Sequence, residues 1–282
     1  ANVLFNGIAY GMLLFIIAVG LSVTMGLMGF VNLAHGAFAM LGGYVTAQLM
    51  LQAGLPFLLT LPMAFLIAAA VGLMLERTLY RRLYRASELD QVLLTIGIVF
   101  MSVAATTYFF GSSQQPIKVP SWLTGQVSFA GLDFGVYRLF LIVVGVIITI
   151  ALILGMERTR LGARIRAAVD SPRMAEGVGI DVDLVFAVTF AIGSGLAGLG
   201  GALGVNLVGL EPGFPLKYMT YFLIVVAVGG LGSIRGSLIA ALLLGISDVA
   251  GKYYVPETGA FIIYAVMVGI LLWRPRGLFG KR

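Results

Sequence analysis

Residues Ala1 to Leu75, which begin ANVLFNGIAYGMLLFIIAVGLSVTMGLMGFVNLAHG and end AAAVGLML, contain no charged side chain. A helix needs about 20 mostly apolar residues to cross about 30 Å of hydrocarbon, and a charge at its centre costs about 2.5–3.5 kcal/mol on insertion scales. This stretch is long enough for three membrane-spanning helices. We place them at 3–25, 30–50 and 57–75, with the turn LQAGLP between the last two.

The rest of the 282-residue chain continues this composition, with 60% apolar and only 11% charged residues. A soluble domain has about 25% charged and about 45–50% apolar residues. An ordinary soluble enzyme and a disordered chain are therefore excluded, and the absence of Cys excludes a disulfide scaffold. Further uncharged stretches lie at 91–117, 139–156, 184–210, 218–234, 236–247 and 258–273.

Basic residues gather in three clusters, ERTLYRRLYR (76–85), ERTRLGARIR (157–166) and RPRGLFGKR (274–282). Short cytoplasmic loops collect Lys and Arg, so we place all three clusters inside. Of the 18 Lys and Arg, only Lys118, Arg138, Lys217 and Lys252 then lie outside. The net charge of +6 is thus explained by membrane orientation, and we expect no nucleic-acid partner.

This orientation fixes the remaining spans at 91–110, 139–156, 184–208, 218–231, 237–249 and 258–273. We therefore predict an all-α polytopic membrane protein with nine membrane-spanning helices, or eight if 218–249 is divided differently. The N-terminus is outside and the C-terminus inside. The short Gly-rich segments 218–231 and 237–249 are typical of broken helices, which occur only where protein or a water-filled cavity surrounds them.

Two expectations concern the ends and the loops of this single domain, residues 1–282. No basic n-region precedes the first apolar run, so we expect no cleavable signal peptide, and the lack of an initiating Met leaves open whether residues precede Ala1. The loop at 111–137 is expected outside the membrane, and the loop at 157–183 inside it.

The sequence contains no recognisable catalytic, metal or nucleotide motif. His35 is the single His and has no Cys or nearby carboxylate to complete a metal site. GSGLAG (193–198) matches G-x-G-x-x-G but follows no strand; its small residues instead favour close packing of helices in lipid. No G-x-x-x-x-G-K-[ST] loop is present, so any ATP hydrolysis belongs to another chain.

The inner loop 157–183 predicts a helical hairpin. Residues 163–169 are expected to form one short helix, and Asp170 and Ser171 before Pro172 start a second that ends at Glu176, ahead of Gly177 and Gly179. Such a hairpin suits docking of a cytoplasmic partner. The alternative is a solvated basic loop that only fixes the topology.

Four segments resemble the permease subunits of the branched-chain amino acid (Liv-type) ABC importers. They are GLSVTMGLMGFVNLAHGAFAMLGGY (20–44), RAAVDSPRMAEGVGIDVDLVFAVTFAIGSGLAGLGGAL (166–203), VVAVGGLGSIRGSLIAALLLG (225–245) and LLWRPRGLFG (271–280). They span nearly the whole chain in the family's order. The compact length is more similar to the LivH type than to the longer LivM type.

The resemblance implies a translocation subunit, not an enzyme, in the inner membrane of a bacterium, with its N-terminus periplasmic and its C-terminus cytoplasmic. Its partners would be a second, LivM-like permease, two cytoplasmic ATPase subunits that bind ATP and Mg, and a periplasmic solute-binding protein. No cofactor is expected on this chain itself. The resemblance also implies a coupling segment that contacts the ATPase, formed by Asp170, Ser171, Pro172, Arg173, Met174 and Ala175.

Polar groups inside membrane spans commonly face the interior of a bundle. They single out Asn32, His35, Asn206 and Glu211 as pathway candidates. Asn32 and His35 could equally satisfy backbone groups freed by a helix break, and Glu211 could be an ordinary carboxylate at the membrane surface.

Two other function classes stay open. Short Gly-rich spans also suit a secondary transporter, but such carriers often hold ionisable residues in their spans, and few are present here. A passive channel for a small neutral solute fits the uncharged spans but leaves the inner hairpin without a role. The resemblance suggests branched-chain amino acids, while related amino acids, amides, urea and aromatic acids remain possible.

Overall fold

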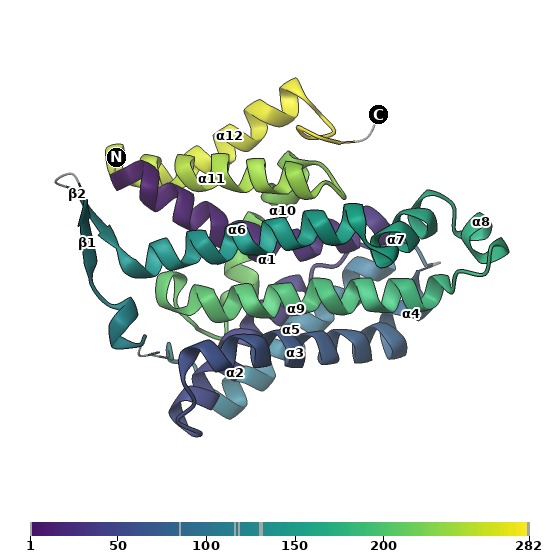
Figure 1. Ribbon diagram of the computed structural model, residues 1–282, viewed down its shortest axis with the longest axis horizontal. Helices are drawn as coiled ribbons and strands as arrows, with labels where there is room; N and C mark the ends of the chain where they lie inside the picture. Colours follow the sequence, from purple (N-terminus) through teal and green to yellow (C-terminus); the bar gives the residue numbers. More distant parts are fainter. Residues whose placement is uncertain (1, 85, 116, 118, 130–131, 281–282) are drawn as a thin grey trace.

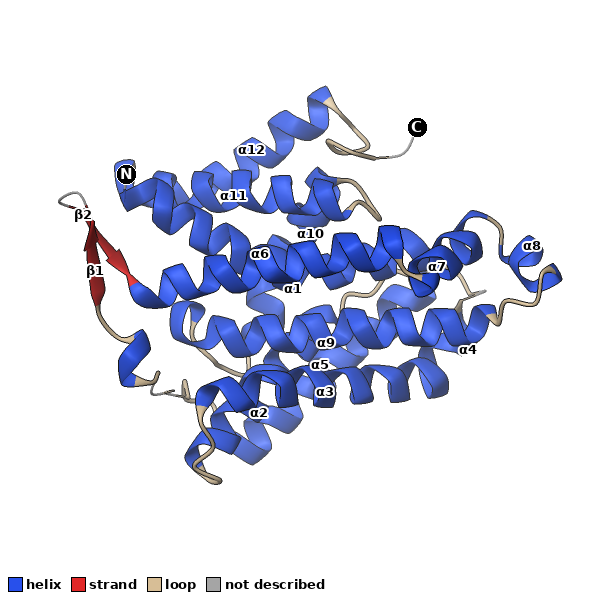
Figure 2. Ribbon diagram, viewed as in Figure 1, coloured by secondary structure: helices blue, strands red, loops and turns tan. Residues whose placement is uncertain are grey.

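The computed structural model describes residues 2–84, 86–115, 117, 119–129 and 132–280. Arg85, Lys118, Lys281 and Arg282, which contributed to the predicted orientation, lie outside these described residues. Long helices run roughly side by side along the long axis of the molecule (Figure 1). The protein is helical almost throughout, apart from a two-stranded sheet at one end (Figure 2).

The helices and strands fall close to the predicted spans. In chain order they are α1 (Asn2–Met28), α2 (His35–Leu51), α3 (Phe57–Leu75), the π-helical turn η1 (Glu76–Tyr80), α4 (Arg81–Leu83), α5 (Glu88–Phe110), the 3-10 turn η2 (Ser121–Leu123), β1 (Gln126–Phe129), β2 (Leu132–Gly135), α6 (Val136–Arg158), α7 (Arg160–Asp170), α8 (Pro172–Gly177), α9 (Val182–Val208), α10 (Phe214–Gly229), α11 (Ile234–Tyr254) and α12 (Gly259–Trp273).

Within the described residues, six helices are long and apolar enough to cross a membrane: α1, the continuous run Phe57–Leu83, α5, α6, α9 and α11. α10 and α12 are shorter apolar helices, and α2 has 17 residues. An all-α polytopic architecture is therefore confirmed, whereas the count of nine crossings stays a prediction because three of the nine segments are shorter than a full span.

Three details differ from the sequence-based expectation. The segment predicted as a short helix at 237–249 is the 21-residue α11, which extends to Tyr254 and contains the ion pair of Asp248 and Lys252. The span predicted from residue 30 begins at His35. The loop at 111–137 contains the antiparallel pair β1–β2, with Val127 opposite Phe134.

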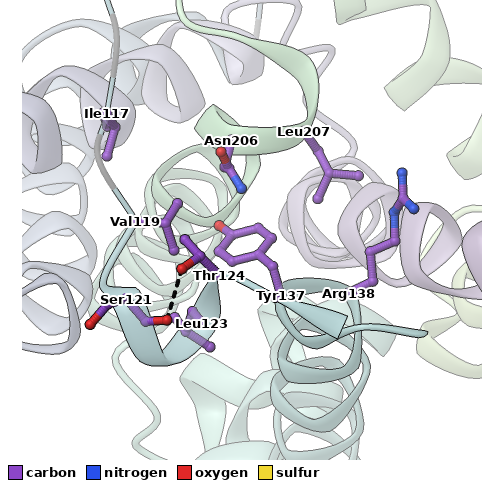
Figure 3. A pocket seen from close by; sticks show the side chains of 11 residues that line it. Ile117, Val119, Ser121, Leu123, Thr124, Tyr137, Arg138, Asn206 and Leu207 are labelled. Carbon is purple, nitrogen blue, oxygen red and sulfur yellow. Dashed lines mark hydrogen bonds between the residues drawn. The ribbon is translucent and has the colours of Figure 1, made fainter. Parts of the chain in front are cut away.

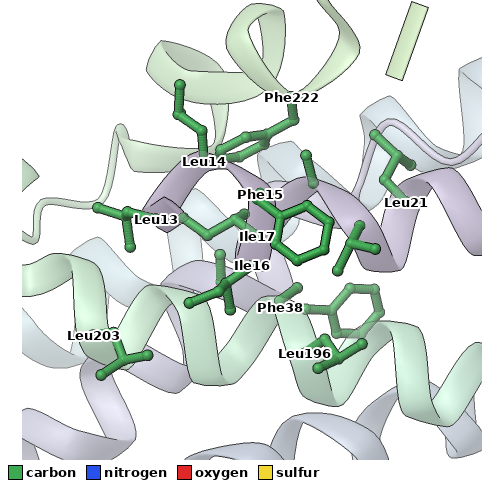
Figure 4. Packing of buried hydrophobic residues seen from close by; sticks show 14 of the residues in the cluster. Leu13, Leu14, Phe15, Ile16, Ile17, Leu21, Phe38, Leu196, Leu203 and Phe222 are labelled. Carbon is green, nitrogen blue, oxygen red and sulfur yellow. The ribbon is translucent and has the colours of Figure 1, made fainter. Parts of the chain in front are cut away.

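α1 lies at the centre of the bundle. In the most apolar 18-residue stretch of α1, 89% of the residues are buried. The corresponding shares are 11% in α5 and 17% in α6, so these two helices lie at the periphery. Figure 4 shows Phe15 and neighbouring α1 side chains between Phe38 of α2, Leu196 of α9 and Phe222 of α10. The largest apolar core of the protein is thus organised around its first helix.

Glycines bring α1, α2 and α9 into backbone contact. A Cβ on Gly20 of α1 would overlap the carbonyl of Gly193 on α9, and a Cβ on Gly201 of α9 would overlap the backbone of Ala39 on α2. Gly193 of α9 lies against Gly20 of α1, and Gly200, farther along α9, lies against Ile17, which comes earlier in α1. The two long helices are therefore antiparallel. Small residues permit such close approach, and close packing drives helix association in lipid.

The structure contains an inverted repeat. α1 and α9 each have 27 residues and end before a glycine with positive φ, Gly29 (62°) and Gly209 (78°). Each is followed by a short connection and a shorter helix, α2 with 17 and α10 with 16 residues. α3 then packs on α9, and α11 packs on α1. Inverted-topology repeats are common in transporters and meet near the substrate path.

The segment after α12 folds back onto the end of α10. The backbone N–H groups of Leu278 and Phe279 donate to the carbonyls of Val228 (2.7 Å) and Gly229 (3.2 Å). The last carbonyls of a helix have no partner within it. Residues 278–279 supply partners for the end of α10.

The glycine contacts predict a strong effect of one added methyl group. Gly201→Ala should lower the free energy of unfolding by about 1–3 kcal/mol, because the new Cβ forces α9 away from α2. We expect a lower melting temperature in detergent. Gly97→Ala on α5 is the control: nothing lies within 4 Å of its Cβ position, so this variant should match or exceed wild type. Equal melting temperatures for both variants would contradict the proposed close packing.

Candidate functional site

The break between α1 and α2 buries the first two predicted pathway residues. Asn32 is 1% exposed, and its Oδ1 accepts from the backbone N–H of Ala34 at 3.1 Å. His35 is 2% exposed, and its Nε2 lies 2.7 Å from the carbonyl oxygen of Ile17 in the middle of α1. Because a carbonyl only accepts hydrogen bonds, Nε2 carries the proton and donates.

The hydrogen bonds of Asn32 Oδ1 and His35 Nε2 are both made to the backbone, whereas the buried Nδ2 of Asn32 has no hydrogen-bond partner among the described residues. Asn32 forms a turn of the Asx kind, which substitutes for missing helical hydrogen bonds, and His35 ties the start of α2 to α1. The geometry supports the structural alternative for these residues. A substrate role for Asn32 and His35 stays a prediction.

The two broken regions meet at the starts of the short helices. A Cβ on Gly36, in the first turn of α2, would lie 3.0 Å from Cα of Pro215, in the first turn of α10. The helix N-termini of the two repeats are therefore in contact. Short helices that begin inside a bundle present free N–H groups and a positive dipole end to whatever lies beside them.

Aromatic side chains pack around Phe30, at the start of the segment between α1 and α2. The Phe30 ring lies 5.1 Å from that of Tyr80 and 5.8 Å from that of Tyr84. The Tyr84 hydroxyl donates to Oε1 of the buried Glu76 at 2.7 Å, and burial together with this hydrogen bond raises the pKa of Tyr84 above its usual range. The phenol therefore stays protonated and able to donate.

Asn206 lines a cavity of about 730 Å³ that is also lined by Ser121 and Thr124 of the connection between α5 and α6. Figure 3 shows Asn206 near the end of α9 pointing toward Tyr137 of α6, with Arg138 beyond Leu207 on one side and Val119, Ser121 and Thr124 on the other. The Tyr137 hydroxyl donates to the carbonyl of Leu203 at 2.5 Å. Asn206 is exposed to this cavity and is available to a solute there.

A second cavity of about 410 Å³, at the same end of the bundle, adjoins the first, because Arg138 and Leu207 line both. Glu211, the fourth predicted pathway residue, lies near it through an ion pair with Lys217, whose Nζ is 2.8 Å from Oε1 of Glu211. The structure thus brings Asn206 and Glu211 to one region and keeps Asn32 and His35 in another.

The predicted inner hairpin is formed by α7 and α8. The Thr159 side chain accepts from the N–H of Gly162 at 3.1 Å and caps α7. Pro172 occupies the first turn of α8, and Gly179 has φ 83° just beyond it. The hairpin lies at the end of the molecule opposite β1–β2 (Figure 1). It has its own small core, formed by Ile165, Ala168, Ala175, Val182 and Val185.

The six residues expected to contact an ATPase differ in exposure. Asp170, Pro172, Arg173 and Met174 are exposed, and Met174 reaches 74%. Ser171 is half-buried, and Ala175 is 2% exposed within the hairpin core. Met174 is therefore available for direct contact, while Ala175 supports the hairpin from within.

An ion pair links the hairpin base to the α10–α11 turn. Nη2 of Arg235 lies 2.5 Å from Oε1 of Glu157 at the end of α6. Both side chains are more than half exposed, so the pair contributes little stability. The pair places Arg235 and the hairpin at the same end of the bundle.

Arg138 and Asp248 were not predicted as site residues. Asp248 was placed at the end of a short helix, although its spacing of four residues from Lys252 is the signal of an acid–base pair inside a longer helix. Arg138 lies in the first turn of α6, directly after β2, and nothing in its local sequence indicates a cavity. Among the described residues no group of three or more His, Cys, Asp or Glu could hold a metal ion.

Comparison with known proteins identifies the class of the chain. A family model described as the permease component of the branched-chain amino acid transport system matches residues 3–271, and the chain belongs to this family. It is 27% identical to the branched-chain amino acid permease BraD of Pseudomonas aeruginosa, over 99% of this chain and 95% of that protein. No solved structure matches the chain.

The share of each relative's length that this chain covers distinguishes the LivH type from the LivM type. LivH of Salmonella typhimurium is 29% identical over 99% of this chain and 94% of its own length. LivM of Escherichia coli is 28% identical over 95% of this chain but only 68% of its own length. The chain is of the LivH type, as expected. Since these relatives are transport permeases, it is a multi-pass membrane permease component and not an enzyme.

The hydrogen bond of His35 predicts a stability effect. His35→Phe keeps an aromatic ring but removes the donor to Ile17, which should cost about 0.5–1.5 kcal/mol of unfolding free energy. We expect a lower melting temperature with an unchanged KM for transport. An unaltered melting temperature with a raised KM would instead assign His35 to the solute pathway.

Proposed function

We propose that this chain is the translocation subunit of an ATP-driven importer that carries branched-chain or related small amino acids across the inner membrane of a bacterium. Membership of the permease family supports transport, and the α7–α8 hairpin supports the ATP-driven form. That hairpin extends past the bundle, has its own core and presents Met174 to its surroundings.

The other components of the importer are inferred from two observations: the sequence has no nucleotide-binding motif, and the chain resembles two types of permease. The permeases it resembles include both LivH and LivM, so we infer a heterodimer with a LivM-like permease. Two cytoplasmic ATPase subunits would bind ATP and Mg, and a periplasmic solute-binding protein would deliver the solute. Asp170, Ser171, Pro172, Arg173 and Met174 would contact one ATPase, with Ala175 as their internal support.

The solute path would run from the outer cavities toward the contact between α2 and α10. Asn206 lines the wider outer cavity, and Glu211 lies beside the narrower one. Asn32 and His35 would shape the break farther in. A secondary transporter or a passive channel is the alternative function, and the protruding hairpin favours the ATP-driven importer over both.

Met174 provides the test of coupling. Met174→Glu places a charge on the exposed apolar tip without touching the hairpin core, and should lower ATP-driven uptake about tenfold. Uptake and ATPase activity would be measured with the reconstituted importer, assembled with the second permease, both ATPase subunits and the solute-binding protein.

Leu89→Glu is the matched control. Leu89 is 66% exposed in the first turn of α5, where an acidic residue is well tolerated. This variant should transport like wild type. Wild-type uptake by Met174→Glu would show that the tip makes no functional contact.

The orientation and the span count are tested together. The chain has no Cys, so single replacements report one position each. Arg235 lies at the hairpin end of α11 and Lys252 near its other end. We expect a membrane-impermeant thiol reagent added outside whole cells to label Lys252→Cys but not Arg235→Cys. Labelling of Arg235→Cys from outside would overturn both the orientation and the nine-span count.

A further inference from the structure

The narrower cavity is lined by an ionisable pair, Asp248 and Lys252. Its lining includes Asn6, Tyr10, Arg138, Tyr221, Asp248 and Lys252. These residues come from α1, α6, α10 and α11, so four helices contribute to the cavity. Charged groups within membrane-spanning helices are expensive and usually mark a functional site.

Asp248 has one oxygen without a partner. The residue is 2% exposed, and its Oδ2 accepts from Nζ of Lys252 at 2.6 Å. Its Oδ1 is buried and makes no hydrogen bond among the described residues. A buried acceptor left unpaired is costly, and an ionised carboxylate can accept several donors. Asp248 is therefore prepared to accept a further N–H group from a molecule in the cavity.

Arg138 has the complementary capacity. Its Nη1 donates to Oδ1 of Asn6 at 2.9 Å. Within the described part of the chain no carboxylate lies within ion-pair distance of Arg138, whereas Lys217 pairs with Glu211 and Lys252 with Asp248. A guanidinium has five N–H donors and binds a carboxylate through two parallel hydrogen bonds. Arg138 is thus the cation of this cavity with room for an external carboxylate.

We propose that this cavity is a binding site for the main-chain groups of a free α-amino acid. Asp248 accepts hydrogen bonds from the ammonium group, and Arg138 donates to the carboxylate. The proposal rests on the proposed transport function and adds the residues that recognise the cargo. Because the wider cavity opens beside Arg138, the ligand side chain has space there. The site would select α-amino acids as a class and not one side chain.

A cysteine-protection experiment tests the site directly. Val249 lines the same cavity, and Val249→Cys introduces the single thiol of this chain. The whole importer would be reconstituted with cysteine-free partner subunits, and the labelling rate measured without the solute-binding protein. Saturating L-leucine should slow labelling about tenfold or more. Its keto acid, which lacks the ammonium group, and its amine, which lacks the carboxylate, should not protect at the same concentration.

Variants assign the two contacts. Asp248→Asn and Arg138→Gln, each in the Val249→Cys background, should abolish protection by L-leucine. Glu257→Gln removes an acidic charge from the exposed α11–α12 connection and should leave protection intact. If the importer with Asp248→Asn fails to assemble, the labelling of the Arg138→Gln variant tests the proposal. Equal labelling with and without L-leucine, or protection that persists in both variants, would overturn the proposal and leave Asp248 and Lys252 as a structural ion pair.

The same preparations separate this inference from the proposed function. If the Val249→Cys importer takes up L-leucine with ATP but L-leucine does not protect the thiol, the proposed binding site is wrong and the proposed transport function stands. Absence of ATP-dependent uptake by the importer with the unmodified chain would overturn the proposed function itself.

Discussion

The structure depends on the close approach of helix backbones in a solvent that gives apolar side chains no reason to associate. Lipid tails are as apolar as Leu, so helices are held by packing between small residues. Gly20 against Gly193 and Gly201 against Ala39 place α1, α2 and α9 at distances that any larger residue would prevent. This contact fixes the two antiparallel long helices, and the inverted repeat is built around them.

Breaking a helix inside such a bundle creates a second requirement. The N–H and C=O groups released at the break need partners, because no water is available in the hydrocarbon to supply them. At the first break, Asn32 accepts from the N–H of Ala34, and Gln91 of α5 accepts from the N–H of Val31. His35 donates to the carbonyl of Ile17 within α1 and so ties α2 to α1. Arg138 and Asp248, which have capacity for a further partner, lie near the ends of α6 and α11 that are farthest from the α7–α8 hairpin.

Much of the fold was predictable because it follows from local rules. Uncharged runs located the long helices, and the Asp170–Ser171–Pro172 start with the Gly177 and Gly179 stop located α8 within a residue. The rest depends on contacts between distant residues. The pair of Asp248 with Lys252 lines a cavity that also needs residues of α1, α6 and α10, and the β1–β2 pair arises in a loop without a strong alternating pattern. Asn206 and Glu211 were predicted as pathway residues from their polarity, whereas the position of Arg138 at a cavity depends on distant helices that no local pattern indicates.

The return of residues 278–279 to the end of α10 bears on how the protein is made. The carbonyls of Val228 and Gly229 receive their partners from a segment that leaves the ribosome only after α11 and α12. Until then the second short helix has an unfinished end, while its counterpart α2 is already complete. Because α2 and α3 both pack on α9, the first repeat cannot be packed before α9 has been made, and the end of α10 is completed only when residues 278–279 follow.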